Sequence, residues 1–418
     1  MELIVIPITF IFIIIKYNIN VLAKILLSFY SLGAMFGILL TKHPLFPYMQ
    51  NVGYQDMSIG ASVYLLFTFL ILFYPVITSK NISLCGGICK QRFERLSYIL
   101  IGISALYILY IFPHIFDAFN AIDFAEYKED IMEAGGFDAS DGNSVLEKIF
   151  SFQVMLRPFI MFFFCYAIAK LNHQKKFIML LGLAALLPSL LHTMAAAHRN
   201  IIVFSLIDFF LCFIIFYKEY TEKQRKRFFI LFSLVAAIVG FVVVYFALLR
   251  FSKSSSGLDE YVEYSLYRYL GEPMVDFNTM IWGTDKLLYG NKCFPVIREY
   301  MGLSFQNPAT IRDDLANLPY IIYFFYTIVG NFYMDFGAIG TILLLVIIAC
   351  FFYWLLKIKL KYNTITRLLI LFMYTSTTIQ NYFYFAYMGY NNILFVWQAI
   401  FIWIVYRYID NHKVRLSK

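Results

Sequence analysis

The chain has 418 residues, of which 61% are hydrophobic and 14% are charged. A soluble domain carries about 25% charged residues, so the composition excludes an ordinary soluble protein. The net charge of +8 would suit a nucleic-acid partner, but most basic residues lie in short segments between apolar runs, where they set membrane orientation. We therefore expect a lipid bilayer and no nucleic acid around this chain.

Apolar runs long enough to cross a bilayer recur along the chain. A hydrocarbon core about 30 Å thick needs about 20 apolar residues in a helix, and no run alternates as a membrane β-strand would. The sequence predicts an all-α fold, a single polytopic membrane domain over 1–418 with about eleven transmembrane helices. They are expected near 3–16, 21–40, 61–78, 97–116, 149–169, 177–197, 200–217, 228–249, 335–356, 368–386 and 392–408. Pro319–Gly330 is also apolar and is either a further span or a re-entrant segment.

The distribution of Lys and Arg between the spans predicts the orientation. Alternate segments on one side hold 20 of these residues, and the short segments on the other side hold 4. Because basic residues collect on the cytoplasmic side, the C-terminus is expected inside and the N-terminus outside. The basic segments are 79–96, 170–176, 218–227, 357–367 and 407–418.

Two predicted outer segments are long. Segment 117–148 holds nine acidic residues against Lys128 and Lys148, and a solvated loop explains it well. Segment 250–334 is larger, mixes both charge signs and is rich in aromatic residues. We expect chemistry in this second segment, which we interpret as a large outer loop with short helices.

Arginines at three spans carry the first functional hypothesis. An ionisable group within a span is costly and is a functional candidate by default, and Arg157 is the clearest case. Arg199 follows His198 at an outer turn, and Arg250 ends a span on the same side. Planar guanidinium groups suit a diphosphate, although a buried salt bridge or snorkelling would also explain Arg157.

The large outer segment supplies aromatic and acidic residues in the run from Tyr267 to Asp276. It contains Arg268, Tyr269 and Glu272, a set that suits sugar rings with their apolar faces and hydroxyl edges. Ordinary packing of an outer cap is the alternative interpretation. Asp335 is expected at the outer start of a late span, where a helix N-terminus favours a carboxylate with or without a catalytic role.

Several motifs are missing from the sequence. There is no G-x-x-x-x-G-K-[ST] motif, which disfavours ATP-driven transport by this chain itself. There is also no D-x-D, H-E-x-x-H or paired C-x2-C set, so the sequence predicts neither a metal site nor a bound cofactor.

These features together resemble the oligosaccharide repeat-unit polymerases, the Wzy-type O-antigen and capsule polymerases. The resembling parts are the span number, the turn His198-Arg199-Asn200, Arg250 before a large outer loop, Gly271-x-Pro273, and the run Gly330–Gly337. The resemblance implies a GT-C-like, metal-independent glycosyltransferase of the bacterial inner membrane. Its substrate would be an undecaprenyl-diphosphate-linked oligosaccharide, and a chain-length regulator and a flippase of the same pathway would be partners.

The resemblance also implies roles for the residues. Arg157, Arg199 and Arg250 are expected on the diphosphates, with Arg268 as a weaker fourth and Tyr269 on a sugar. The base that deprotonates the acceptor hydroxyl is expected among Glu272, Asp335, Asp276 and His198. Two other functions remain open: an O-antigen ligase or related lipid-linked glycosyltransferase, and a flippase or exporter of lipid-linked sugar.

Overall fold

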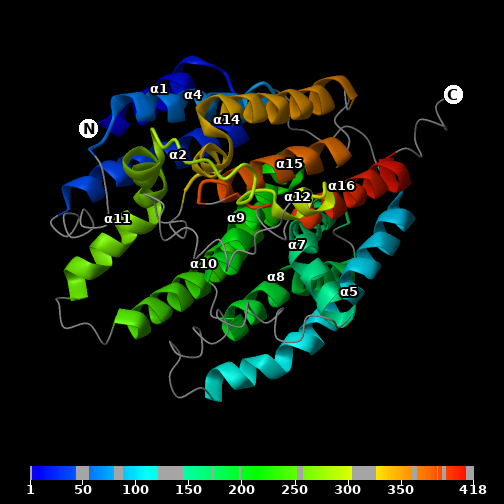
Figure 1. The fold of residues 1–418 in the computed structure, drawn as a ribbon. Coiled ribbons are helices and arrows are strands. Elements are labelled where there is room, and N and C mark those ends of the chain that lie inside the picture. Colours follow the sequence, from blue (N-terminus) through cyan, green and yellow to red (C-terminus); the bar gives the residue numbers. More distant parts are fainter. Residues whose placement is uncertain are drawn as a thin grey trace. The chain divides into compact units, whose positions relative to one another are not determined.

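The chain folds into helices, and the part that the structure describes contains no strand (Figure 1). A computed structural model describes residues 2–43, 56–79, 88–120, 145–171, 174–196, 199–251, 258–303, 326–359, 365–383, 385–387 and 392–410. The all-α prediction is confirmed for these residues. Most of the predicted acidic segment 117–148 lies outside them, as do His198 and most of Pro319–Gly330.

The described residues form thirteen α-helices, together with short 3-10 and π-helical turns. Their bounds are α1 (Val5–Lys16), α2 (Val21–Lys42), α4 (Ile59–Ile77), α5 (Lys90–Asn120), α7 (Val145–Lys170), α8 (Lys175–Ala196), α9 (Arg199–Phe216), α10 (Glu222–Phe251), α11 (Leu258–Asp276), α12 (Pro295–Tyr300), α14 (Ile328–Trp354), α15 (Ile365–Gln380) and α16 (Asn392–Val405). Short 3-10 turns are η1 (Glu2–Ile4) and η2 (Tyr217–Glu219). Single π-helical turns are η3 (Phe277–Ile281), η5 (Leu355–Lys359) and η7 (Tyr406–Asp410).

Six helices in the described residues are long and apolar enough to cross a membrane. They cover Val21–Lys42, Ile59–Ile77, Lys90–Phe116, Lys175–Ala195, Ile201–Glu219 and Ile328–Lys357. Each coincides with a predicted span, which fits a multi-pass membrane protein. The other five predicted spans stay predictions; α1, with its 12 residues, is only about 18 Å long.

The chain divides into two compact units. Unit 1 consists of Met1–Ile82, Ser255–Lys361 and Tyr374–Trp397. Unit 2 consists of Ser83–Ser254, Tyr362–Met373 and Gln398–Lys418. Distant segments of the chain alternate between the two units, and the single polytopic domain over 1–418 stays a prediction.

In unit 1, side-chain caps fix where α2 and α4 begin and end. The Asn20 carboxamide accepts a hydrogen bond from the Ala23 N–H and so caps α2. The same carboxamide donates to the carbonyls of Val76 and Ser79, at 2.5 and 2.6 Å, where α4 ends. Because no water reaches such groups in a bilayer, these bonds stabilise the helix ends and hold α2 and α4 together.

Helix α11 packs directly against α2 in unit 1 (Figure 1). Its Gly271 faces Gly37 of α2, and a Cβ on Gly271 would lie 2.5 Å from the Gly37 backbone nitrogen. Gly33, one turn before Gly37, leaves room for the ring of Tyr382. Small residues four apart let membrane helices approach closely. Within the predicted outer segment 250–334, α11 is therefore a 19-residue helix that packs against α2, and the placement of this segment as an outer loop stays a prediction.

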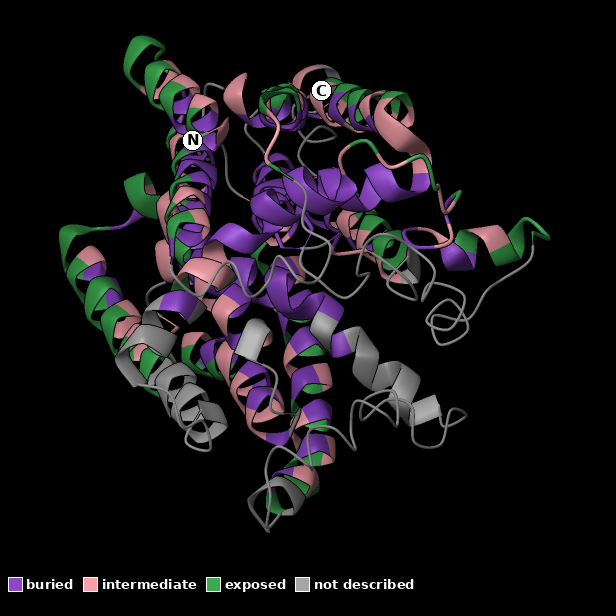
Figure 2. Cartoon of the chain, turned by 60° about the vertical axis from the view of Figure 1, so that its left-hand side comes forward, coloured by how far each residue is buried: buried purple, intermediate pink, exposed green. Residues whose placement is uncertain are grey.

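In unit 2, helices α5, α7, α8 and α9 pack against one another, and α10 packs on α9. Aromatic side chains fill much of the interior: Phe93 contacts Phe163, and Phe162 contacts Phe216. Figure 2 shows buried and exposed residues on different faces of single helices, as expected when one face meets neighbouring helices and the other meets lipid.

Candidate functional site

Arg268 and Glu272 form an ion pair on α11, and the two residues flank Gly271, where α11 crosses α2. The guanidinium Nε and Nη2 both lie 3.0 Å from the Glu272 Oε1. Glu272 is only 4% exposed, whereas Arg268 is partly exposed. Burial raises the pKa of Glu272, and the positive charge of Arg268 opposes this rise. A carboxylate with a raised pKa takes up a proton more readily than an ordinary glutamate does.

Arg268, Glu272 and Asp276 are spaced four residues apart and so share one face of α11. Asp276 is fully buried at the last position of the helix, just before the turn η3. The face thus runs from a partly exposed cation to two buried carboxylates. The structure pairs Arg268 with Glu272 and places Asp276 one turn further along the same face.

Tyr269 lies beside this face and is 41% exposed. Its ring centroid is 5.4 Å from that of Phe383, in a tilted contact. Tyr267, two residues earlier, packs its ring at 5.8 Å from Phe36 of α2. The two tyrosines therefore differ in their surroundings. The Tyr267 ring packs between α11 and α2, whereas part of the Tyr269 side chain is exposed and could contact a ligand.

Asp335 is fully buried within α14, and its partners come from the loop between η3 and α12. Its carboxylate accepts hydrogen bonds from the backbone N–H groups of Lys292, at 3.2 Å, and Cys293, at 2.7 Å. Asp335 lies in the first part of α14, two residues before the break at Gly337, after which a second helical stretch begins. The carboxylate anchors a loop, which accounts for it without catalysis.

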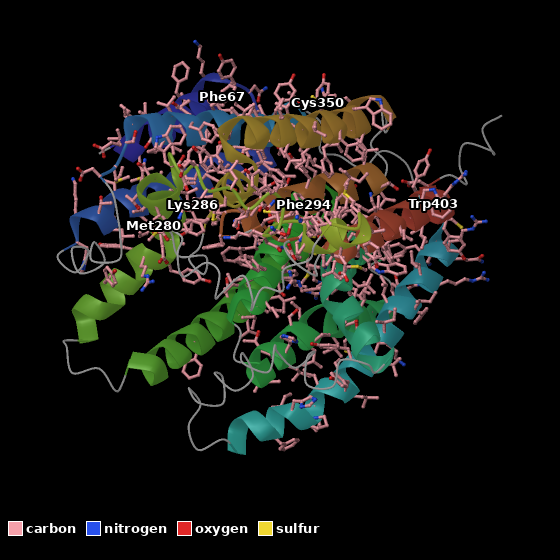
Figure 3. All side chains as sticks on the ribbon, viewed as in Figure 1. Phe67, Met280, Lys286, Phe294, Cys350 and Trp403 are labelled. Atoms are coloured by element: carbon pink, nitrogen blue, oxygen red, sulfur yellow. The ribbon has the colours of Figure 1, made fainter. Side chains whose placement is uncertain are left out.

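A break in α14 follows Asp335 closely. Gly337 has φ of 66° and ψ of −173°, a conformation that essentially only glycine adopts. The carbonyls of Met334 and Asp335 accept hydrogen bonds from Leu288 and Tyr289 of the loop, at 2.9 and 3.0 Å. The loop thus replaces the helical partners that these carbonyls lose at the break; Lys286 and Phe294, labelled in Figure 3, lie near its two ends.

Lys292 of this loop is a buried cation that sequence reasoning missed. Its Nζ lies 5.0 Å from the centroid of the Tyr326 ring and 3.6 Å from the Met334 sulfur. Burial lowers the pKa of Lys292 to about 8, opposed by the nearby Cys293 and Asp335. No short motif surrounds Lys292 in the sequence, so no signal pointed to it.

Arg157 lies inside unit 2 and is 7% exposed. Its Nη2 is 3.5 Å from the Asp208 carboxylate, and its Nη1 donates to the Ile201 carbonyl at 3.3 Å. The buried salt bridge considered from the sequence is therefore present. Asp208 neutralises the charge of Arg157, so this guanidinium attracts an anion less than an uncompensated cation would.

Arg199 and Arg250 are placed by their helices alone. Arg199 opens α9, close to Ile201, whose carbonyl Arg157 contacts. The ring of Phe209 in α9 stacks on that of Phe228 in α10 with centroids 4.3 Å apart, which sets the register of the two helices. Arg199 lies 10 residues from Phe209 and Arg250 lies 22 residues from Phe228, so at about 1.5 Å per residue Arg250 lies about 18 Å further along the axis. A common depth of the three arginines stays a prediction.

No group of three or more His, Cys, Asp or Glu side chains that could hold a metal ion occurs in the described ranges. Comparisons of the chain with protein-family models, with curated proteins and with solved structures found no match. The functional interpretation therefore rests on the residues and their geometry.

Proposed function

We propose that the chain is a membrane glycosyltransferase that joins undecaprenyl-diphosphate-linked oligosaccharide repeat units on the periplasmic face of a bacterial inner membrane. The observation that carries this proposal is the buried Glu272, held by Arg268 on a helix of the predicted outer segment. The several apolar helices long enough to cross a membrane are compatible with this location. The resemblance to repeat-unit polymerases supplies the reaction class.

In the proposed reaction, Glu272 accepts the proton of an acceptor hydroxyl on a newly delivered repeat unit. The hydroxyl oxygen forms a bond to the anomeric carbon of the growing glycan. The bond from that carbon to the lipid diphosphate breaks, and the diphosphate leaves with the electron pair. A carboxylate with a raised pKa suits this task, because it accepts a proton more readily than an ordinary glutamate does.

We assign Arg199 and Arg250 to the diphosphates, because charge develops there as the bond breaks and fixed cations stabilise it. Their separation along the helix axis suits contact with different parts of the lipid-linked substrates. Arg268 acts on Glu272 and contributes less to the diphosphates. Tyr269 offers its exposed ring to a sugar. Asp276 is the second candidate base, whereas His198 and Asp335 rank below it.

A transporter of lipid-linked sugar is the second candidate function, favoured by the break in α14. Broken membrane helices often form ion or substrate sites in transporters, where the freed carbonyls coordinate the ligand. Here the carbonyls of Met334 and Asp335 already accept hydrogen bonds from the loop. These bonds leave the break with less capacity for a transported ion, so the glycosyltransferase remains our proposal.

Deletion of the gene in its bacterial host tests the three functions against one another. A polymerase deletion leaves single repeat units attached to the final acceptor lipid. A ligase deletion leaves long polymer on the lipid carrier, and a flippase deletion leaves single repeat units on the carrier at the cytoplasmic face. We expect the first pattern, and either of the others would reject the proposed function.

A further inference from the structure

The interior of unit 2 contains polar side chains from four packed helices, α5, α7, α8 and α9. Polar groups within membrane helices are costly and commonly mark a substrate path. Most of these are satisfied within the bundle: Ser205 donates to the Ile201 carbonyl and contacts the Ser189 hydroxyl at 2.9 Å. The Gln153 Nε2 donates to the Ser104 hydroxyl at 3.2 Å.

Among the described residues, the buried polar atoms of these helices without a hydrogen-bond partner include the Ser97 Oγ on α5 and two atoms on α7, the Arg157 Nε and the Gln153 Oε1. Both residues are nine-tenths buried or more, with Gln153 at 2% exposure. They lie four residues apart on α7, so their Cβ atoms are about 6 Å apart on one face. One atom is a donor and the other an acceptor, yet they do not bond to each other.

The chemistry of this pair specifies a ligand group. The group must accept a hydrogen bond from a guanidinium N–H and donate one to a carboxamide oxygen. A hydroxyl does both, whereas a phosphate oxygen that carries no proton can only accept. The salt bridge to Asp208 is a single contact at 3.5 Å, so it leaves the Nε side of the guanidinium unused.

We propose that Gln153 and Arg157 form a binding site for a sugar hydroxyl inside the helix bundle of unit 2. The assignment of the hydroxyl to a sugar of the lipid-linked repeat unit rests on the proposed function. In this account Arg157 binds the glycan and not the diphosphate, with Asp208 holding its charge in place. Gln153 then determines which glycan is accepted.

Binding to the purified full-length chain in lipid nanodiscs tests this site. The probes are the lipid-linked repeat unit, the free repeat-unit oligosaccharide, and undecaprenyl diphosphate without sugar. Gln153→Met removes the acceptor at similar length. Gln153→Glu places a carboxylate beside the unpartnered Nε and should fill the site while preserving the fold. Thr193→Val is the control, because the Thr193 hydroxyl is already satisfied by the Ser189 carbonyl at 2.9 Å.

We expect both Gln153 variants to bind the two sugar-bearing probes at least about tenfold more weakly, the loss of one good hydrogen bond in a buried site. Thr193→Val should bind them normally, and the sugarless carrier should bind all variants alike. Equal binding of the sugar-bearing probes by the natural chain and both Gln153 variants would overturn the site. An equal loss of affinity of the Gln153 variants for undecaprenyl diphosphate without sugar would also overturn the site, because the ligand group would then be a phosphate.

Failure of the site and failure of the proposed function give different results. If the chain polymerises repeat units and both Gln153 variants have an unchanged KM, the proposed function is supported and the proposed hydroxyl site is rejected. If the chain does not polymerise repeat units but binds the free oligosaccharide, and this binding weakens in the Gln153 variants, the hydroxyl site is supported and the proposed function is rejected.

Discussion

Gly37 of α2 and Gly271 of α11 are in direct backbone contact, and this contact positions Glu272. A Cβ on Gly271 would lie 2.5 Å from the Gly37 nitrogen and 2.6 Å from its Cα. Backbone atoms cannot move aside as a flexible side chain would. Any larger residue at position 271 therefore separates the two helices and displaces Arg268 and Glu272, the ion pair whose residues flank this position.

We expect Gly271→Ala to lower the free energy of unfolding by about 1–3 kcal/mol, the usual range for overpacking in a close contact. Polymer formation should fall with it. Gly102→Ala is the matched control, because a Cβ on Gly102 of α5 meets nothing within 4 Å. That variant should be neutral or slightly more stable, since alanine favours helices. Thermal unfolding in detergent measures both; equal midpoints for the two variants would contradict the contact.

The pH dependence of activity should reflect the raised pKa of Glu272. As a base, Glu272 must be ionised, so activity should rise with pH through an apparent pKa above that of an ordinary glutamate. Arg268 opposes this rise in pKa, so Arg268→Met should move the acid limb to higher pH. Initial rates against pH for the two proteins measure the shift. A limb that stays in place, or moves to lower pH, would exclude Glu272 as the titrating group.

Lys292 should make stability depend on pH in the alkaline range. Its pKa is about 8 in the folded chain, below the value of 10.5 for an ordinary lysine. Between these values the unfolded chain binds more protons, so stability rises with pH, by up to about 3 kcal/mol. Lys292→Met should remove this rise, whereas Lys286→Met, at an exposed position of the same loop, should keep it. Unfolding midpoints from pH 8 to 10 provide the measurement, and a rise that persists in Lys292→Met would refute the assignment.

The buried pair of Arg157 and Asp208 should be sensitive to the loss of one partner. Asp208→Asn leaves a buried guanidinium without its counter-ion and should cost about 3–5 kcal/mol. Replacing both residues, Arg157→Met with Asp208→Leu, should recover much of that loss, because no buried charge remains. Denaturant unfolding of the single and double variants gives the coupling energy. Additive losses in the double variant would show that the two charges do not interact.

Six of the eleven predicted spans coincide with long apolar helices in the described residues, because a membrane span is a local property of the sequence. A run of about twenty apolar residues can be recognised without knowing which parts of the chain it packs against. The helices Val21–Lys42 and Ile59–Ile77 therefore match the predicted spans closely. The shared face of Arg268, Glu272 and Asp276 can also be read from the sequence once the segment is known to be helical, because residues four apart lie on one face of a helix.

Contacts between residues far apart in the sequence could not be predicted. Nothing near Asp335 indicates that its carboxylate binds the backbone of Lys292 and Cys293, more than 40 residues earlier. The break at Gly337 was hidden within an apolar run, because a glycine there is equally compatible with a continuous helix. The depth of Arg250 depended on the register of α9 and α10, which ring contacts set.

The most direct test of the proposed function is elongation by the purified chain. A synthetic undecaprenyl-diphosphate-linked repeat unit is the only substrate, and the products are separated by length. We expect the natural chain and Asp285→Asn, altered at an exposed carboxylate, to form a ladder of polymers, and Glu272→Gln to leave single repeat units. No ladder from the natural chain, or a full ladder from Glu272→Gln, would contradict the account.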